Sequence, residues 1–322
     1  MSSDVFHRTQ APDAVPGPLS QFRVLAAVLM CAVMAGCVDE SSDPVLSVSR
    51  FDVWKIPASG VFIPEPRALF SDADDQVYVL DKAGRVLVYD STGRLIRQWE
   101  MPEHSIGKPE GVWRLHDGTI AVADTHYHRV IIFSDDGDVL RMFGTKGSGP
   151  GQFVFPVAVA QDDAGFLYVG EYGDRQRIQK FTPEGEFVTM FGEHGTGEGQ
   201  FQRPSAIACD REEVYVLDAF NDRIQVFDRN GAFLRVITPG AGSDPLQFPY
   251  DLKTGPDGLF YIIENKGGRL TVMEKNGTVR GRFGKPSYAN DGFNNPWALA
   301  VLSDGRVLVA DTGNHRLIEL TR

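Results

Sequence analysis

The stretch "EVYVLDAFNDRIQVFDRNGAFLRVI", residues 213–237, decides the fold, because the rest of the chain repeats its plan. An apolar run ends in an acid, Asp218, and a short polar loop separates this acid from Arg223, which opens a second apolar run. Asn230 and Gly231 then form a turn signal before a third run. Short runs of this kind, divided by turn residues, are typical of antiparallel β-strands.

The same plan occurs six times in the chain. The corresponding acids are spaced 43, 47, 47, 46 and 47 residues apart, and an arginine follows each within four to six positions. The acids are Asp81, Asp124, Glu171, Asp218, Glu264 and Asp311, and the arginines are Arg85, Arg129, Arg177, Arg223, Arg269 and Arg316. A fixed period of this length, built from short strands, is the signature of propeller blades. Because a catalytic pair is needed only once, we interpret the recurring acid and arginine as structural hydrogen bonds.

A further short apolar run, beginning at a proline, precedes each acid, as in "PSAIACD" at 204–210. Its small residues suit an innermost strand, so each repeat is expected to have four strands. The sixth repeat stops at Arg322, after its third strand, and the run "VLSVSRFDVWKI" at 45–56 can supply the fourth. The sequence therefore predicts an all-β fold, a six-bladed β-propeller with four-stranded blades over residues 45–322, closed by an N-terminal strand.

A family resemblance accompanies this pattern. The strings "DAFNDRIQVF" (218–227) and "DTGNHRLIEL" (311–320), with connectors such as "GEGQFQRPSAIA" (197–208), resemble NHL repeats, and the resemblance covers nearly all of residues 62–322. It implies the same six-bladed propeller. It leaves the function open, because NHL propellers include RNA binders, protein binders, sensor domains and a zinc lyase.

The N-terminus indicates export. Residues 24–36, "VLAAVLMCAVMAG", are too few to span a bilayer but fit the apolar core of a secretory signal. The run ends in "VMAGC", which resembles the lipobox of bacterial lipoproteins. We predict a lipoprotein signal peptide over residues 1–36, a lipidated Cys37 carrying acyl chains such as palmitate, and a short tether over 37–44. The alternative is an ordinary signal peptide in which Cys37 is incidental.

These features predict a lipid-anchored protein of the cell envelope. Val38, rather than Asp, follows the lipidated cysteine and resembles the outer-membrane pattern if the host is Gram-negative. The propeller would then lie in the periplasm or at the cell surface, attached to the membrane only through its N-terminal lipid. We expect a monomer.

Charge and cysteine content narrow the function further. The net charge of −11 argues against nucleic-acid binding, which depends on basic patches. Cys31 falls within the signal peptide and Cys37 would carry lipid, which leaves Cys209 without a disulfide partner. Its setting in an apolar strand indicates packing rather than a nucleophile.

Loops from all blades meet around the axis of a propeller, so we expect the binding site there. The first candidates are residues at the channel mouth, next to the inner-strand prolines; the second group lies on loops between the second and third strands. Together the candidate binding residues are Arg67, Glu110, Tyr250, Asp251, Trp297, His126, Tyr127, Tyr172 and Phe220. Aromatic side chains beside a few charges are typical of protein or peptide recognition, and of glycan recognition second.

The alternative function is a metal-dependent hydrolase or lyase, with calcium or zinc held at the central channel. Glu110 and Asp251 could contribute oxygen ligands there, and His126 and His128 are an obvious pair to test for zinc. However, the position of His128 within its repeat corresponds to Gly268 in another repeat, and a metal ligand would not be exchanged for glycine. We assign no metal ligand, no catalytic residue and no cofactor. We therefore expect a binding scaffold rather than an enzyme.

Overall fold

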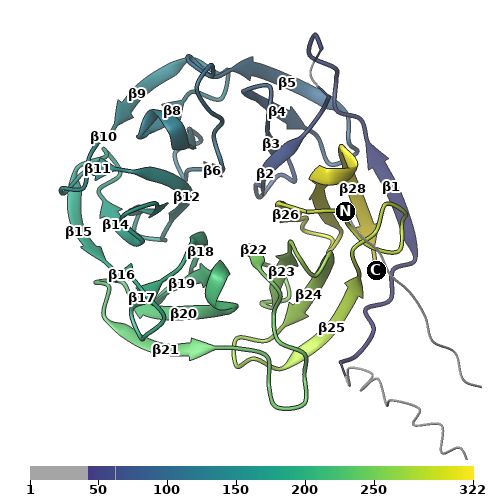
Figure 1. Ribbon diagram of the computed structural model, residues 1–322. Helices are drawn as coiled ribbons and strands as arrows, with labels where there is room; N and C mark the ends of the chain where they lie inside the picture. The colour runs from purple at the N-terminus through teal and green to yellow at the C-terminus, as the bar shows by residue number, and fades with distance from the viewer. Residues whose placement is uncertain (1–42, 62) are drawn as a thin grey trace, which may run out of the picture. The chain divides into compact units, whose positions relative to one another are not determined.

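The computed structural model describes residues 43–61 and 63–322, which form a ring of six antiparallel sheets around a central axis (Figure 1). The six-bladed propeller predicted from the repeats is thus confirmed. The predicted signal peptide and Cys37 lie outside the described residues. Within the described ranges, no helix has the length and apolar character needed to cross a membrane.

Each blade has four strands, and the first strand of every complete repeat is the innermost. Blade 1 comprises β2 (Pro66–Ser71), β3 (Val77–Asp81), β4 (Arg85–Tyr89) and β5 (Leu95–Glu100). Blade 2 comprises β6 (Gly111–Arg114), β7 (Ile120–Asp124), β8 (Arg129–Phe133) and β9 (Val139–Phe143). Blade 3 comprises β12 (Phe155–Gln161), β13 (Leu167–Tyr172), β14 (Arg177–Phe181) and β15 (Phe187–Phe191). Blade 4 comprises β18 (Pro204–Cys209), β19 (Glu213–Asp218), β20 (Arg223–Asp228) and β21 (Phe233–Ile237). Blade 5 comprises β22 (Pro249–Thr254), β23 (Phe260–Glu264), β24 (Arg269–Met273) and β25 (Val279–Gly284).

Blade 6 joins the two ends of the chain. It comprises β26 (Ala298–Val301), β27 (Val307–Asp311), β28 (Arg316–Thr321) and, as its outer strand, β1 (Arg50–Trp54). β1 runs antiparallel to β28, with Arg50 opposite Thr321 and Trp54 opposite Leu317. The predicted closure by an N-terminal strand is confirmed, although the strand is shorter than the 45–56 run.

The residues before β1 are fastened to blade 5. The amide of Leu46 donates to the carbonyl of Arg282 (2.8 Å), and the amide of Arg282 donates to the carbonyl of Pro44 (2.9 Å). Oδ2 of Asp43 lies 2.8 Å from Nη1 of Arg282 in an ion pair. Asp43 and Pro44, inside the segment expected to be a tether, therefore contact the propeller.

The core is divided among the junctions between blades. Within the described residues, six hydrophobic clusters each combine side chains of two neighbouring blades. One cluster packs Trp54 and Leu317 of blade 6 against Leu69 and Tyr89 of blade 1. Because the first and last repeats share a core, burial of apolar surface stabilises the closed ring.

In each repeat the acid is buried and forms an ion pair with the arginine. In blade 3, for example, Nε of Arg177 donates to Glu171 (2.6 Å), and the same guanidinium also donates to the carbonyls of Ser148, Gly149 and Gln152 in the preceding connector. The other five pairs are equally direct. Their role is therefore to fix the connectors between blades, as their recurrence indicated.

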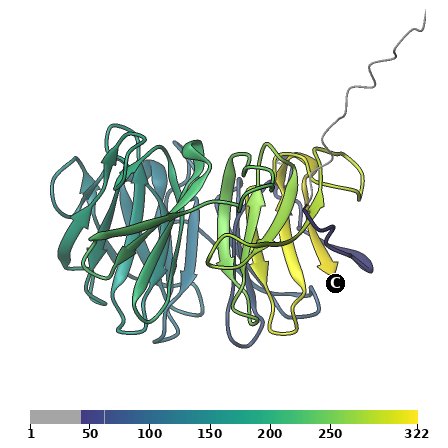
Figure 2. The same cartoon turned by 90° about the horizontal axis from the view of Figure 1, so that it is seen from below.

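One face of the ring carries both the connectors between blades and the loops between second and third strands. Three of these loops contain a 3-10 turn: η1 (Thr125–Tyr127), η2 (Ala219–Asn221) and η3 (Thr312–Asn314). Two connectors form short parallel pairs, β10 (Thr145–Lys146) with β11 (Gln152–Phe153) and β16 (Glu193–His194) with β17 (Gln200–Phe201). We call this the loop face; Figure 2 shows the strands running between it and the opposite face.

Candidate functional site

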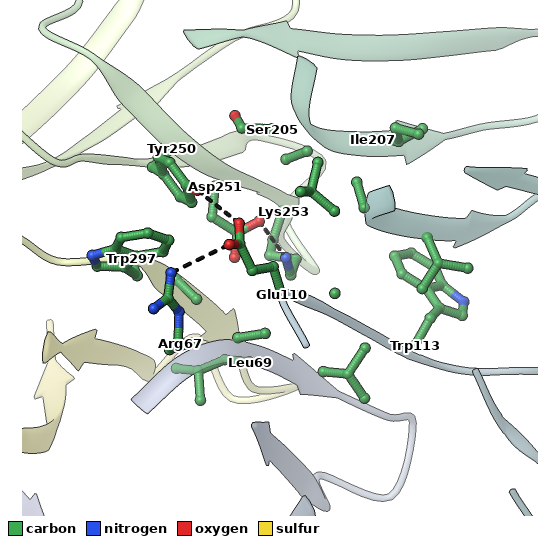
Figure 3. A pocket seen from close by; sticks show the side chains of 18 residues that line it. Arg67, Leu69, Glu110, Trp113, Ser205, Ile207, Tyr250, Asp251, Lys253 and Trp297 are labelled. Atoms are coloured by element: carbon green, nitrogen blue, oxygen red, sulfur yellow. Dashed lines mark hydrogen bonds and ion pairs between the residues drawn. The ribbon is translucent and has the colours of Figure 1, made fainter. Parts of the chain in front are cut away.

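The residues that directly follow the inner-strand prolines surround the channel mouth. They line one cavity (Figure 3) and are Arg67, Glu110, Val157, Ser205, Tyr250 and Trp297. The structure thus brings together five of the candidate residues from four different blades, because Asp251 lines this cavity too. Each inner strand begins at the loop face, so the residue after its proline is placed at the mouth by the repeat itself.

Glu110 is at the centre of the mouth. Its Oε1 lies 3.3 Å from Nη2 of Arg67, and its Oε2 lies 2.8 Å from Nη2 of Arg203. The hydroxyl of Tyr250 donates to the same Oε2 (3.1 Å) and also contacts Nη2 of Arg203. Burial raises the pKa of the Tyr250 hydroxyl well above its usual range, so it remains a neutral donor.

Aromatic rings hold the two guanidinium groups in place. The Cζ atom of Arg67 lies 3.8 Å from the ring centroid of Trp297, and that of Arg203 lies 3.6 Å from the centroid of Tyr172. Tyr250 and Trp297 pack with their centroids 4.5 Å apart. Such stacking strengthens when it is shielded from water, and here it fixes the orientation of both cations.

Asp251 lines the same cavity, next to Tyr250 in β22. It is buried, forms an ion pair of 2.5 Å with Nζ of Lys253, and accepts a hydrogen bond from the amide of Leu299 (3.0 Å). Burial raises the pKa of its carboxyl, and Lys253 opposes this shift. Figure 3 shows Lys253 beside Asp251, with Trp113 apart from them across the channel.

The loop candidates divide into two groups. Tyr172 stacks on Phe155 (5.0 Å between centroids), and His126 lies 5.7 Å from that same ring, so both continue the aromatic cluster at the mouth. Phe220, with 59% of its surface exposed, packs against Phe248 at 5.0 Å.

Tyr127 has a different environment from the other candidates. Its hydroxyl accepts a hydrogen bond from the amide of Ser105 (2.9 Å), and its ring lies beside the Arg129 guanidinium. This side chain fixes the connector between blades 1 and 2, a role that its position in the sequence did not indicate.

Three residues that the sequence reasoning missed directly precede inner-strand prolines. Arg203, Phe248 and Asn295 have positive φ angles of 69°, 53° and 45°. Residues before proline favour extended backbone, and a positive φ on a non-glycine residue costs of order 1–3 kcal/mol. Loops of the preceding blades hold two of them: Gln176 accepts from the Arg203 amide (2.8 Å), and Asp222 accepts from the Phe248 amide (2.6 Å).

The three residues with positive φ share one pocket on the loop face, which we call the blade 4–6 groove. The groove has a volume of about 330 Å³ and is lined by Arg203, Phe220, Phe248, Tyr250, Asn265, Asn295 and Trp297. A second hollow of about 450 Å³, which includes Lys266, adjoins it at Phe220 and Phe248. By contrast, the cavity within the channel mouth measures about 40 Å³, room for a few water molecules at most. A larger ligand must therefore bind on the face, above the mouth.

The oxygen ligands considered for a channel metal are already paired. Glu110 contacts two arginines and Asp251 contacts Lys253. In residues 43–61 and 63–322, no three His, Cys, Asp or Glu side chains converge as a metal site requires. The residues at the mouth therefore do not fit a calcium or zinc ion.

Cys209 is the last residue of β18 and lies toward the end of the channel opposite the loop face. It borders a cavity of about 150 Å³ with Phe70, Trp113 and Leu252. Burial raises the pKa of this thiol far above its usual range, so the thiolate that a nucleophile needs is disfavoured.

Comparison with known proteins shows that part of the chain is similar to a known repeat family. Residues 293–319, which cover most of blade 6, match the model of the NHL repeat. This segment is similar to an NHL repeat. The predicted resemblance to NHL repeats is thereby confirmed, while the bacterial lipoprotein type stays a prediction. Human NHL repeat-containing protein 3 is 27% identical over 214 residues, 60% of this chain, and the match spans 59% of the length of that relative.

Solved structures share the propeller architecture of this chain at low sequence identity. A streptogramin B lyase superposes with a TM-score of 0.59 at 15% identity, covering 84% of this chain and 97% of the other. Virginiamycin B lyase from Staphylococcus aureus has a TM-score of 0.61 at 14% identity, covering 85% and 86%. A Bacteroides caccae protein of unknown function has a TM-score of 0.58 at 16% identity, covering 77% and 89%. At these identities the likeness concerns the fold alone.

Proposed function

We propose that this NHL propeller is a binding scaffold that recognises a protein or peptide through the blade 4–6 groove on its loop face. One observation carries the proposal: three neighbouring blades each place a residue with a strained backbone in the wall of the same pocket. Strain of this kind persists where the surrounding structure enforces it, and it clusters at ligand sites. The exposed ring of Phe220 then offers an apolar anchor of the type that dominates protein interfaces.

A protein or peptide is favoured over a glycan by the composition of this groove. Tyr250 is buried and contributes to the wall rather than presenting an open ring face, and two amide side chains, Asn265 and Asn295, accompany the aromatic residues. A mixed apolar and amide surface suits a peptide backbone with an apolar side chain.

We further propose that Cys37 is lipidated and attaches the propeller to the cell envelope, at the outer membrane in a Gram-negative host. The support is the sequence "VMAGC" after an apolar run of signal-peptide length. Two or more acyl chains are sufficient for stable anchoring, so a charged membrane-binding patch on the propeller is not required.

Site-specific photo-crosslinking tests the binding proposal. A photoreactive phenylalanine analogue is placed at position 220 on the loop face or, as a control, at Arg211 in the turn after β18 on the opposite face. Captured proteins are identified, purified and tested for direct binding. We expect crosslinks at 220 and a purified partner whose affinity falls with Phe220→Ala but not with Arg211→Ala. Crosslinks from the opposite face alone would show that the assigned face is wrong.

A further inference from the structure

The charges at the channel mouth do not balance. Arg67 and Arg203 share a single carboxylate, Glu110, and these three side chains are only 18%, 13% and 5% exposed. Asp251 and Lys253 below them form a neutral pair. The mouth therefore holds one positive charge more than its carboxylates compensate. Because removing a charge from water is costly unless it is paired, this excess favours binding of an anion.

Arg203 has donors left for that anion. All of its side-chain hydrogen bonds within the described residues come from Nη2, which leaves Nη1 and Nε without a protein partner. The guanidinium is already fixed by stacking on Tyr172 and by the Tyr250 hydroxyl. A carboxylate that accepts a hydrogen bond from Nη1 or Nε of such a fixed group loses little entropy to side-chain ordering.

An aromatic pocket lies directly beside this cation. Arg203 itself lines the blade 4–6 groove, together with Phe220, Phe248 and Trp297. Nδ2 of Asn265 is bound to the carbonyl of Pro296 (2.9 Å), while its Oδ1 has no hydrogen-bond partner within the described residues and is available to a ligand amide. The groove thus combines a guanidinium that can donate to a ligand carboxylate, an apolar pocket, and an amide oxygen that can accept a hydrogen bond from the ligand.

We propose that the blade 4–6 groove binds peptides in which a carboxylate stands next to an aromatic or large apolar side chain. Arg203 binds the carboxylate, supported by the charge of Arg67, and the side chain packs between Phe220, Phe248 and Trp297. The carboxylate is supplied by a chain terminus or by an acidic side chain. This inference rests on the proposed peptide-binding function and specifies its ligand class. The negative net charge of the protein does not oppose it, because charges beyond about 8 Å are screened at physiological ionic strength.

Fluorescence anisotropy with labelled tetrapeptides and the purified full-length protein tests the ligand class. One peptide ends in Phe with a free carboxyl, the second is its C-terminal amide, the third is an amide with Glu before Phe, and the fourth ends in Ala with a free carboxyl. We expect the amidated Phe peptide and the Ala peptide to bind at least about tenfold more weakly than the first, the loss of one charge-assisted hydrogen bond or of one buried ring. Binding of the Glu-Phe amide would identify an acidic side chain as the source of the carboxylate; failure of this peptide alone would identify the chain terminus.

Two variants test the carboxylate-binding part and the aromatic part of the groove separately. Arg203→Gln should abolish the preference for the free carboxyl over the amide, whereas Phe248→Gly should weaken both peptides and keep their ratio. Glycine accepts the φ of 53° at position 248, so this variant is expected to fold. Arg94→Gln and Tyr288→Ala, which alter exposed side chains outside the groove, are the matched controls. If Arg203→Gln folds poorly, Arg203→Lys takes its place. This variant keeps the charge but not the planar guanidinium, and its affinity for the free-carboxyl peptide should be intermediate.

The result that overturns the inference is binding of the plain Phe amide by the wild-type protein as tightly as both peptides that carry a carboxylate, the free-carboxyl peptide and the Glu-Phe amide. A random peptide library separates this from failure of the proposed function. Library binders that lose affinity with Phe220→Ala but show no carboxylate preference would leave the binding function standing and refute the ligand class. A library without any binder would refute both.

Discussion

The indole Nε1 of Trp54 donates a hydrogen bond of 3.0 Å to Oε2 of Glu319, 265 positions later in the chain. Trp54 lies in the outer strand of blade 6 and Glu319 in the strand next to it. The buried indole also packs against Tyr89 of blade 1, at 5.8 Å between ring centroids. A single side chain therefore connects the start of the chain to both its last and its first repeat.

Replacing Trp54 should destabilise the closed ring. For Trp54→Ala we expect a loss of about 3–5 kcal/mol in the free energy of unfolding, the usual cost of removing a buried aromatic side chain. Trp54→Phe should lose only about 1 kcal/mol, since Arg306 still pairs with Glu319 at 2.8 Å. Denaturant unfolding measures both. If Trp54→Ala is as stable as wild type, β1 does not hold the ring closed.

The recurring ion pairs should be sensitive to loss of the acid. Asp218 accepts hydrogen bonds from Arg223 (2.9 Å), Asn221 (2.8 Å) and the Gln202 amide (2.7 Å). Asp218→Ala removes the carboxylate that these donors share and leaves the charge of Arg223 uncompensated, and we expect a loss of about 3–5 kcal/mol in unfolding experiments. Arg50→Gln, which breaks an exposed pair, should change stability by less than about 1 kcal/mol. Similar effects from both variants would contradict a structural role for the buried pair.

The protein should lose stability at alkaline pH. Burial, reinforced by a hydrogen bond to Asp257, raises the pKa of Tyr261 to about 12. Burial also raises the pKa of Tyr78, Tyr89, Tyr168, Tyr215 and Tyr250. Tyrosines in the unfolded chain ionise near pH 10, so above that pH the unfolded state binds fewer protons than the folded state and stability falls.

Unfolding at a series of pH values, with tyrosinate absorbance as a second signal, measures this effect. The tyrosine contribution should be complete below pH 10 and diminish as the pH rises through the folded-state values. Tyr261→Phe should reduce the slope of stability against pH above about 10. Ionisation of all tyrosines near pH 10 while the protein is still folded would refute the prediction.

The proposed membrane anchor depends on one cysteine, Cys37. Cys37→Ser should abolish incorporation of labelled palmitate and move the protein from the membrane fraction to the soluble fraction of the envelope. Cys209→Ser should leave both unchanged and serves as the matched control. A Cys37→Ser protein that stays with the membrane would favour a different mode of attachment.

The repeat pattern was sufficient to predict the fold, because the strands, turns and acid–arginine pair of each blade are all close in sequence. The positions of Arg67, Glu110, Tyr250 and Trp297 at the mouth followed from their place after a proline in a repeated inner strand. The ion pair of Asp251 with Lys253 was also accessible, since residues two apart on a strand point to the same side.

Other parts of the site could not be derived from local sequence. The residue before a proline is expected to be extended, whereas the amides of Arg203 and Phe248, both in the left-handed region, donate to Gln176 and Asp222 of neighbouring blades. The bond from the Ser105 amide to Tyr127 likewise depends on how two distant loops meet.

The fastening of Pro44 and Leu46 to Arg282 has a mechanical consequence. A pull on the chain before Asp43 would reach β1 only after the ion pair and hydrogen bonds to blade 5 had been broken. Tension is therefore shared by two blades before it can peel the outer strand from Thr321 toward Leu317. A protein held by its N-terminal end can in this way keep its ring shut under load.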